Sequence, residues 1–407
     1  MVLRILELIA FAGFAVSAAY TLFAIVCVAR SSQLSGRRSD RKEVTAPPAG
    51  CELGAASCPA VTIAKPLCGD EPELYENLRS FCEQDYPEYQ VVFGVRDASD
   101  PAAVVARRVI EELPGRDLQL VVEARLHGTN HKVSNLAAMQ PSMKHAIIAV
   151  SDSDMRVGRD YLRAVVAPFA EDSVGAVTCL YRGVPAQANL ASVLGAMAIN
   201  EIFLPSVLVA RTLQPLRYCF GATMALRRSA LEAIGGFHAL ASQLADDYMI
   251  GKLVSDRGEK VALASYLVDN RVDEASMREL FLHELRWART IRSMRPASYA
   301  GTVLTMTLAW SLAFALATRF SIAGLAAVGA AAVLALALQL TARLVLGDGV
   351  PWSPWLIPLR AILSALIYGT AHFGRHVRWK TNNLTVSPGG GLSMAAAPGR
   401  SGASPGE

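Results

Sequence analysis

The hydrophobic positions of this chain are concentrated near its two ends. Residues 5–29 are almost wholly apolar and are long enough to cross a bilayer core of roughly 30 Å. A cleaved secretory signal is the alternative, but the run is longer than a usual signal core and a basic stretch follows it. We therefore predict a membrane anchor over residues 1–30 and a basic linker over residues 31–59. Positive charge favours the cytoplasmic side, which places the chain beyond the anchor in the cytoplasm, on the basis of Arg30, Arg37, Arg38, Arg41 and Lys42.

A second apolar region begins near residue 299. Residues 301–318 and 321–342 carry no charge, with Arg319 between them, and this pattern predicts a pair of membrane spans. A third apolar run, residues 355–372, contains Arg360 and has prolines close by.

The charges that follow the third run bear on its topology. Three full spans would place the next basic residues outside the cell, against the charge bias, whereas a re-entrant or interfacial third segment would keep them inside. We favour the second arrangement, on the basis of Arg375, Arg378 and Lys380. Residues 299–386 are thus predicted to form C-terminal membrane helices with a basic segment, and residues 387–407, rich in Gly, Ala, Ser and Pro, a disordered tail.

Between the apolar ends, residues 60–298 alternate short apolar runs with helical patterns, as α/β domains do. Four runs predict buried strands of a parallel sheet, at residues 61–64, 90–95, 119–122 and 146–150. After the first run, Asp70 is placed to cap a helix whose apolar face is formed by Leu74, Leu78, Phe81 and Cys82. Ligands of such sheets bind beyond the carboxyl ends of the strands.

The polar residues that follow these strands are mostly acidic. Asp97 follows the second run, and Asp152 and Asp154 follow the fourth as a DxD sequence. Two carboxylates so spaced lie about 6–7 Å apart on one side of an extended chain. They suit a hard divalent cation, Mg²⁺ or Mn²⁺, which binds few carboxylates together with substrate phosphate oxygens. Nucleotide-sugar transfer uses such an ion because the departing diphosphate gathers negative charge.

Two further elements complete the set. Asp246 and Asp247 open a helical stretch, and His283-Glu284-Leu285-Arg286-Trp287 lies just before the second apolar region. Each element alone has an ordinary explanation, since aspartates cap turns and an Arg-Trp pair anchors helices at membrane interfaces. Their order is more specific. It resembles the processive and lipid-directed glycosyltransferases of the GT-A fold, whose pattern is D, DxD, (E/T/D)D and (Q/R)xxRW.

A narrower resemblance extends over about residues 60–295. The segments KPLCG (65–69), GxNxKxxNL (128–136), DSDMRV (152–157) and CFGAT (219–223) resemble the ceramide glucosyltransferase group. Within that group, the sequence segments from KPLCG to HELRW resemble those of bacterial hopanoid-biosynthesis-associated glycosyltransferases. The resemblance implies an α/β, Rossmann-like GT-A domain with an N-terminal transmembrane anchor and C-terminal transmembrane or re-entrant helices. It also implies a bacterial inner-membrane protein with a cytoplasmic catalytic domain.

The resemblance also implies roles for individual residues. Asp97 would contact the uracil or ribose of a UDP-sugar, and Asp152 the ribose or sugar. Asp154, with Asp152, would hold the cation, and Lys132 would pair with the diphosphate. Relatives of the ceramide group can carry glycine at the position of Asp154, so a site with one carboxylate is the alternative.

The remaining implied roles concern transfer. Asp247 would take the proton of the acceptor hydroxyl, which gives inversion at the sugar carbon because no covalent intermediate forms. Arg286 would stabilise the leaving diphosphate, and Trp287 would stack on the sugar or acceptor. His283 stands where the family commonly has Gln or Arg, and it can still donate a hydrogen bond to a phosphate or a hydroxyl.

The acceptor is predicted to be a lipid because the Arg286-Trp287 element lies so close to the next apolar region. The apolar stretch 190–213 is either an interfacial helix at the lipid entry or a core helix. N-acetylglucosamine transfer to a hopanoid alcohol is our first hypothesis, and glucose transfer to ceramide the alternative. A polysaccharide synthase is less favoured because the C-terminal membrane portion is short, and a non-catalytic scaffold because the acidic set is intact.

Composition supports a membrane enzyme and excludes other classes. Hydrophobic residues make up 52% and charged residues 18%, against roughly 25% charged in soluble domains. The formal net charge of +4 is too balanced for a nucleic-acid-binding protein, so no nucleic-acid partner is predicted.

Overall fold

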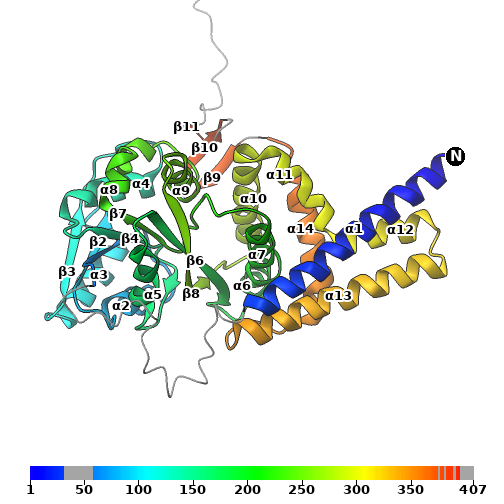
Figure 1. The fold of residues 1–407 in the computed structure, drawn as a ribbon, viewed down its shortest axis with the longest axis horizontal. Coiled ribbons are helices and arrows are strands. Elements are labelled where there is room, and N and C mark those ends of the chain that lie inside the picture. The colour runs from blue at the N-terminus through cyan, green and yellow to red at the C-terminus, as the bar shows by residue number, and fades with distance from the viewer. Residues whose placement is uncertain (32–57, 375, 380–381, 388–390, 395–407) are drawn as a thin grey trace, which may run out of the picture.

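The computed structural model describes residues 1–31, 58–374, 376–379, 382–387 and 391–394. Most of the predicted basic linker, Arg375, Lys380 and residues 395–407 lie outside these described residues. The described part has a globular α/β unit on one side and a group of long apolar helices on the other (Figure 1).

The globular unit is built on an eight-stranded sheet of order β3-β2-β1-β4-β7-β6-β8-β5. Its first half is parallel and contains all four predicted strands: β1 (Val61–Pro66), β2 (Tyr89–Val95), β3 (Asp117–Val122) and β4 (Ile147–Val150). The prediction that all four are buried is wrong for β3, because it is the edge strand and alternates exposed with half-buried positions. The second half is mixed and was not predicted: β5 (Met155–Arg156), β6 (Val174–Pro185), β7 (Met224–Arg227) and β8 (Lys260–Val272).

Helices cover both faces of this sheet. Alternate strand residues point to opposite faces, so Val91 and Phe93 pack in one hydrophobic cluster and Val92 in another. The covering helices are α2 (Leu74–Cys82), α3 (Pro101–Glu112), α4 (His131–Met139), α5 (Tyr161–Val166), α8 (Arg228–Ala233) and α9 (Asp246–Asp256). Short 3-10 turns lie at η3 (Gln140–Ser142), η4 (Ala167–Ala170) and η6 (Phe237–Leu240).

Helix α2 has the predicted apolar face but not the predicted cap. Leu74, Leu78, Phe81 and Cys82 are all buried. The N-cap is Glu73, in a left-handed conformation at φ 59° and without a side-chain cap bond. Asp70 is therefore not the cap, because the helix begins four residues after it.

The apolar helices pack around α1 (Val2–Arg30), which contacts α12 (Thr307–Ala317) and α13 (Ile322–Leu346). The described residues contain four helices long and apolar enough to cross a membrane, or five if a bent pair counts as one span. That pair is α11 (Pro296–Gly301) with η7 (Thr302–Thr305), followed by α12 at an angle of 61°. The span predicted over residues 301–318 is thus not one straight helix, because the helical hydrogen bonding breaks at Met306.

The apolar stretch Leu190–Leu213 forms α6 (Leu190–Met197), a π-helical turn η5 (Ala198–Phe203) and α7 (Leu204–Leu213). It lies between the sheet and the membrane helices (Figure 1). In its apolar window 61% of the residues are buried, against 22% in α13. The stretch therefore packs as core toward β6 and also contacts α1 and α13.

After α13, the chain passes through η8 (Pro354–Leu356) and α14 (Ile357–Ala371) and then returns to the globular unit. Its last strands are β9 (His376–Trp379), β10 (Asn382–Val386) and β11 (Leu392–Met394). Strand β11 falls within the predicted disordered tail. The prediction of disorder is wrong for these three residues, because their backbone pairs with β10. The Leu392 amide also donates to the Ser242 carbonyl at 2.9 Å, so this sheet lies against the globular unit.

Candidate active site

Four aspartates from two parts of the chain meet at the carboxyl end of the sheet. Asp152 and Asp154 lie in the loop between β4 and β5, and Asp246 and Asp247 are the first residues of α9. Lys132, in the first turn of α4, joins the two pairs. Its Nζ lies 2.7 Å from Asp152 Oδ1 and 3.0 Å from Asp246 Oδ2.

The charges of this cluster are strongly coupled. Burial by itself lowers the pKa of Lys132, but the surrounding carboxylates raise it overall, so the lysine stays cationic. Burial raises the pKa of Asp154 to about 8, with a further contribution from Asp152. Burial and the neighbouring Asp246 raise the pKa of Asp247 to about 6. A cation brought to this site would offset that repulsion.

Backbone and side-chain bonds hold the two most perturbed acids. Asp154 accepts a hydrogen bond from Asn270 Nδ2 at 2.9 Å, and its carbonyl accepts from the Arg271 amide at 2.8 Å. Both donors belong to β8, so the unpredicted half of the sheet orients Asp154. The Tyr248 amide donates to Asp247 Oδ1 at 2.7 Å, which is the hydrogen bond expected at a helix N-terminus.

Gly221 shows how closely the two acidic pairs approach. A Cβ atom at this position would lie 2.8 Å from Asp152 Oδ2 and 3.7 Å from Asp247 Oδ2. The first separation is too short for a carbon–oxygen contact. The glycine therefore leaves room for the Asp152 carboxylate beside the backbone.

Helix α10 (Met277–Met294) forms the opposite side of the site. Ser276 caps it by accepting from the Glu279 amide at 3.2 Å. His283, Arg286 and Trp287 have the i, i+3, i+4 spacing that places side chains on one helix face. Burial lowers the pKa of Arg286, and the charges of Asp152, Asp246, Asp247 and Asp154 oppose that shift, so Arg286 lies within electrostatic range of the acidic cluster.

His283 is held by an acid that sequence reasoning missed. Its Nδ1 lies 2.6 Å from Glu274 Oε1, and its ring lies 4.4 Å from that of Trp287. Burial raises the pKa of Glu274, but the bond with His283 lowers it overall, so Glu274 is a carboxylate. The Glu274 position follows β8, a strand that the hydrophobic pattern did not reveal.

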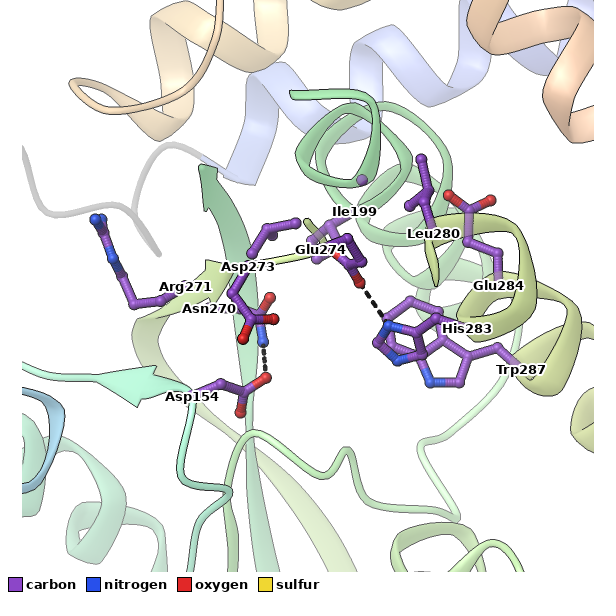
Figure 2. A pocket seen from close by; sticks show the side chains of 12 residues that line it. Asp154, Ile199, Asn270, Arg271, Asp273, Glu274, Leu280, His283, Glu284 and Trp287 are labelled. Atoms are coloured by element: carbon purple, nitrogen blue, oxygen red, sulfur yellow. Dashed lines mark hydrogen bonds and ion pairs between the residues drawn. The ribbon is translucent and has the colours of Figure 1, made fainter. Parts of the chain in front are cut away.

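A small pocket separates the two sides. Figure 2 shows Asp154, Asn270 and Asp273 on one side and His283 and Trp287 on the other. Gly195 and Ile199 of the α6–η5 stretch also line it. The pocket therefore touches the sheet, α10 and the apolar α6–α7 stretch, which also contacts α1 and α13.

Three other residues of the sequence motifs make hydrogen bonds outside the acidic cluster. Asp97 is exposed, and its carboxylate accepts from the amide and hydroxyl of Ser99, both at 2.8 Å, which lowers its pKa. Asn130 and Asn135, the two asparagines of the GxNxKxxNL segment that contains Lys132, have structural bonds. Asn130 caps α4 through the Val133 amide, and Asn135 donates to the Gly94 carbonyl at 2.7 Å.

Lys65 is a second buried cation, and the sequence motifs assign no role to it. It lies in β1, is fully buried, donates to the Asp152 carbonyl, and has its Nζ 3.8 Å from the centre of the Phe81 ring. Burial lowers the pKa of Lys65 to about 7, and the nearby aspartates oppose the shift. A lysine within an apolar strand was the sequence signal for this position.

The described residues contain no group of three or more His, Cys, Asp or Glu side chains placed to hold a metal ion by themselves. Asp152 and Asp154 supply two carboxylates, which matches sites where substrate phosphates complete the shell of Mg²⁺ or Mn²⁺.

Comparison with known sequences decides the family. Residues 9–392 match the profile of Glycosyl transferase family 21. The chain belongs to that family. The α/β GT-A fold with an N-terminal apolar helix, predicted from the sequence, is thereby confirmed.

Similar proteins include ceramide glucosyltransferases. Ceramide glucosyltransferase 3 of Caenorhabditis elegans is 25% identical over 251 residues, which is 59% of this chain and 52% of that protein. The enzyme of Gibberella zeae is 29% identical over 174 residues, 40% of this chain and 33% of that protein. The chain thus spans about half the length, or less, of these curated relatives.

Among solved structures, a mannosyltransferase from Pyrobaculum calidifontis, in complex with GDP-Man and Mn²⁺, has a TM-score of 0.49 and 23% identity. That match covers 90% of this chain and 99% of the other. Glucosyl-3-phosphoglycerate synthase from Mycobacterium tuberculosis, with Mn²⁺ and UDP, has a TM-score of 0.34 and 14% identity, over 64% of this chain and 80% of that one.

Proposed function

We propose that this family 21 glycosyltransferase transfers a sugar from a UDP-sugar to the hydroxyl of a membrane lipid. The observation that carries the proposal is the carboxylate cluster bridged by Lys132, with Arg286 within electrostatic range. This cluster borders a pocket whose other walls are α10 and α6, and both helices pack against the C-terminal helix α14. A charged donor and an apolar acceptor can thus reach one place from opposite sides.

The donor would bind over the cluster. Lys132 and Arg286 are the cations placed to contact the diphosphate, and Asp97, in its exposed turn, would contact the uracil or ribose. Asp152 and Asp154 would hold Mg²⁺ or Mn²⁺, which when bound neutralises charge on the departing diphosphate. The raised pKa of Asp154 supports this assignment, because an acid buried beside another acid is stabilised by a cation.

Asp247 would act as the base. Its Oδ1 accepts a hydrogen bond from the Tyr248 amide. Its Oδ2 lies near Gly221, as does the Asp152 carboxylate. With a pKa of about 6 it is mostly ionised at neutral pH, yet basic enough to take a proton from a hydroxyl as that oxygen attacks the sugar. One base without a covalent intermediate gives inversion. His283 would hydrogen-bond the acceptor or a phosphate, and Trp287 would stack on the sugar or acceptor.

For the substrates, we propose N-acetylglucosamine and a hopanoid alcohol, on the resemblance carried by the segments from KPLCG to HELRW. The second candidate, glucose transfer to ceramide, is favoured by the names of the relatives with 25–29% identity. We further propose that the protein lies in a bacterial inner membrane with its catalytic domain in the cytoplasm.

The test uses the full-length protein in lipid nanodiscs with Mn²⁺. Radiolabelled UDP-GlcNAc and UDP-glucose are each offered with a hopanoid alcohol and with ceramide, and labelled lipid is measured. Label on the hopanoid from UDP-GlcNAc is the expected result, and the ceramide pairing would establish the second candidate. If neither UDP-sugar labels any lipid while UDP still binds, the proposed transfer is wrong. Asp247→Asn is the catalytic control.

A further inference from the structure

Arg360 is a charged residue in the first turn of the apolar helix α14, and it is only 3% exposed. All of its side-chain N–H groups are used. Nη1 and Nη2 donate side by side to the two oxygens of the Glu284 carboxylate, at 2.6 and 2.7 Å. Nη1 also donates to the Leu194 carbonyl at 3.1 Å. Nε and Nη2 donate to the Ser364 hydroxyl, at 3.2 and 3.1 Å. Such an arrangement fixes both the position and the plane of its partners.

These bonds connect three helices at the pocket. Glu284 belongs to α10, lines the pocket, and lies between His283 and Arg286 in the sequence. Leu194 belongs to α6 and precedes Gly195, which also lines the pocket. Arg360 touches none of the carboxylates of the acidic cluster among its described bonds. It therefore acts on the helices that carry the wall of the site.

The segments before and after α14 are bound to other parts of the chain. Before it, the Leu346 carbonyl at the end of α13 accepts from Arg182 of β6. After it, Arg289 and Arg292 of α10 donate to the carbonyls of Phe373, His372 and Gly374 at 2.7–2.9 Å. Figure 1 shows α14 beside α10, between the globular unit and the bundle of α1, α12 and α13. The segment that carries α14 is thus tied to the globular unit before the helix and to α10 after it.

We propose that Arg360 is a positioning residue through which the apolar helix α14 sets the orientation of α10, and with it His283, Arg286 and Trp287, relative to the acidic cluster. A need for stability alone does not explain an arginine here. A buried ion pair is often replaced by apolar residues with little loss of stability, whereas the directional fork has no apolar substitute. This inference rests on the proposed function, because it assigns α10 to transfer.

Three variants test the inference in nanodiscs: Arg360→Met, Arg360→Lys, and the double variant Arg360→Met with Glu284→Met. The double variant removes both charges, so it avoids an unpaired buried carboxylate and keeps the fold. Arg343→Met is the matched control, since Arg343 lies in the neighbouring helix α13 and its described bond goes to the Val350 carbonyl.

We expect UDP affinity in Mn²⁺ to be unchanged in the double variant, while kcat falls about 10- to 100-fold, as a displacement of catalytic groups by roughly 1 Å produces. Arg360→Lys, which keeps the charge without the fork, should retain intermediate activity. Amide hydrogen exchange of residues 277–294 should be faster in the double variant and unchanged in the control.

Wild-type turnover in the double variant, or hydrogen exchange in α10 equal to that of the control, would overturn the positioning role. If the wild-type protein itself transfers no sugar, the proposed function fails. The exchange measurement still decides the coupling of α14 to α10 in that case, because it needs no turnover.

Discussion

Gly221 offers a sharp test of the donor site, because the Gly221→Ala substitution adds one methyl group between the two acidic pairs. The new Cβ would lie 2.8 Å from Asp152 Oδ2. Restoring ordinary van der Waals contact requires a shift of roughly 0.5 Å or more. The Asp152 carboxylate has little freedom to make that shift, because its Oδ1 is 2.7 Å from Lys132 Nζ and its main-chain carbonyl accepts from Lys65.

The expected loss of UDP affinity can be taken from the hydrogen bond that a displaced Asp152 carboxylate would lose. A hydrogen bond between charged groups contributes about 1.5–3 kcal/mol. If the displaced Asp152 loses one such bond to the donor, UDP binding should weaken about 10- to 150-fold, at 1.4 kcal/mol for each factor of ten. The backbone at Gly221 is outside the positive-φ region, so alanine adds no conformational strain there. The folded state should persist, with the loss concentrated in binding and turnover.

Isothermal titration with UDP in Mn²⁺, and KM for the UDP-sugar, measure this loss. Gly329→Ala is the matched control, because the same methyl group at Gly329 in α13 meets nothing within 4 Å. If Gly221→Ala bound UDP as tightly as the control and turned over at the wild-type rate, Asp152 would not be part of the donor site.

Three further predictions concern other parts of the site and the chain. Asp247→Asn should keep UDP affinity and lose about 10²- to 10⁴-fold in kcat, the range for a general base, and retained turnover would remove Asp247 from that role. In the wild-type protein saturated with Mn²⁺, which keeps Asp154 ionised, kcat/KM should fall about tenfold for each pH unit below about 6, because protonation of Asp247 removes the base; a rate independent of pH between 5 and 7 would contradict this. A peptide tag added after residue 407 should be resistant to protease in intact spheroplasts and cleaved in inverted vesicles, because the strands after α14 lie on the globular unit. Cleavage in spheroplasts would show that α14 crosses the bilayer.

The candidate site could be assembled from sequence only in part. Asp152, Asp154, Asp246 and Asp247 were found because acids after strands and at helix starts form a pattern in order along the chain. The structure brings them together, with Lys132 as the bridge. Glu274 and Asn270 were missed because they depend on β8, whose partners β6 and β5 are distant in sequence. No local pattern reports the hydrogen bond from Asn270 to Asp154, which are 116 residues apart, and Glu274 could be assigned only once the end of β8 was placed.

What the sequence determined by itself was local or periodic in nature. Apolar runs at both ends predicted helices long enough for a membrane, alternating short runs predicted the parallel half of the sheet, and the order of acidic motifs predicted a glycosyltransferase of the GT-A type. These signals are readable because hydrophobic burial depends on the spacing of a few neighbouring residues.

The tertiary structure alone decided which distant groups meet. Arg360 was only an unexplained charge in an apolar run until α14 was placed against α10 and α6, where Glu284 and the Leu194 carbonyl accept its hydrogen bonds. The start of α2 beyond Asp70, the exposure of the edge strand β3 and the bend before α12 likewise depended on neighbours in the folded chain. Burial of a charge requires partners, and those partners are set by packing between helices rather than by the residues next to it in the chain.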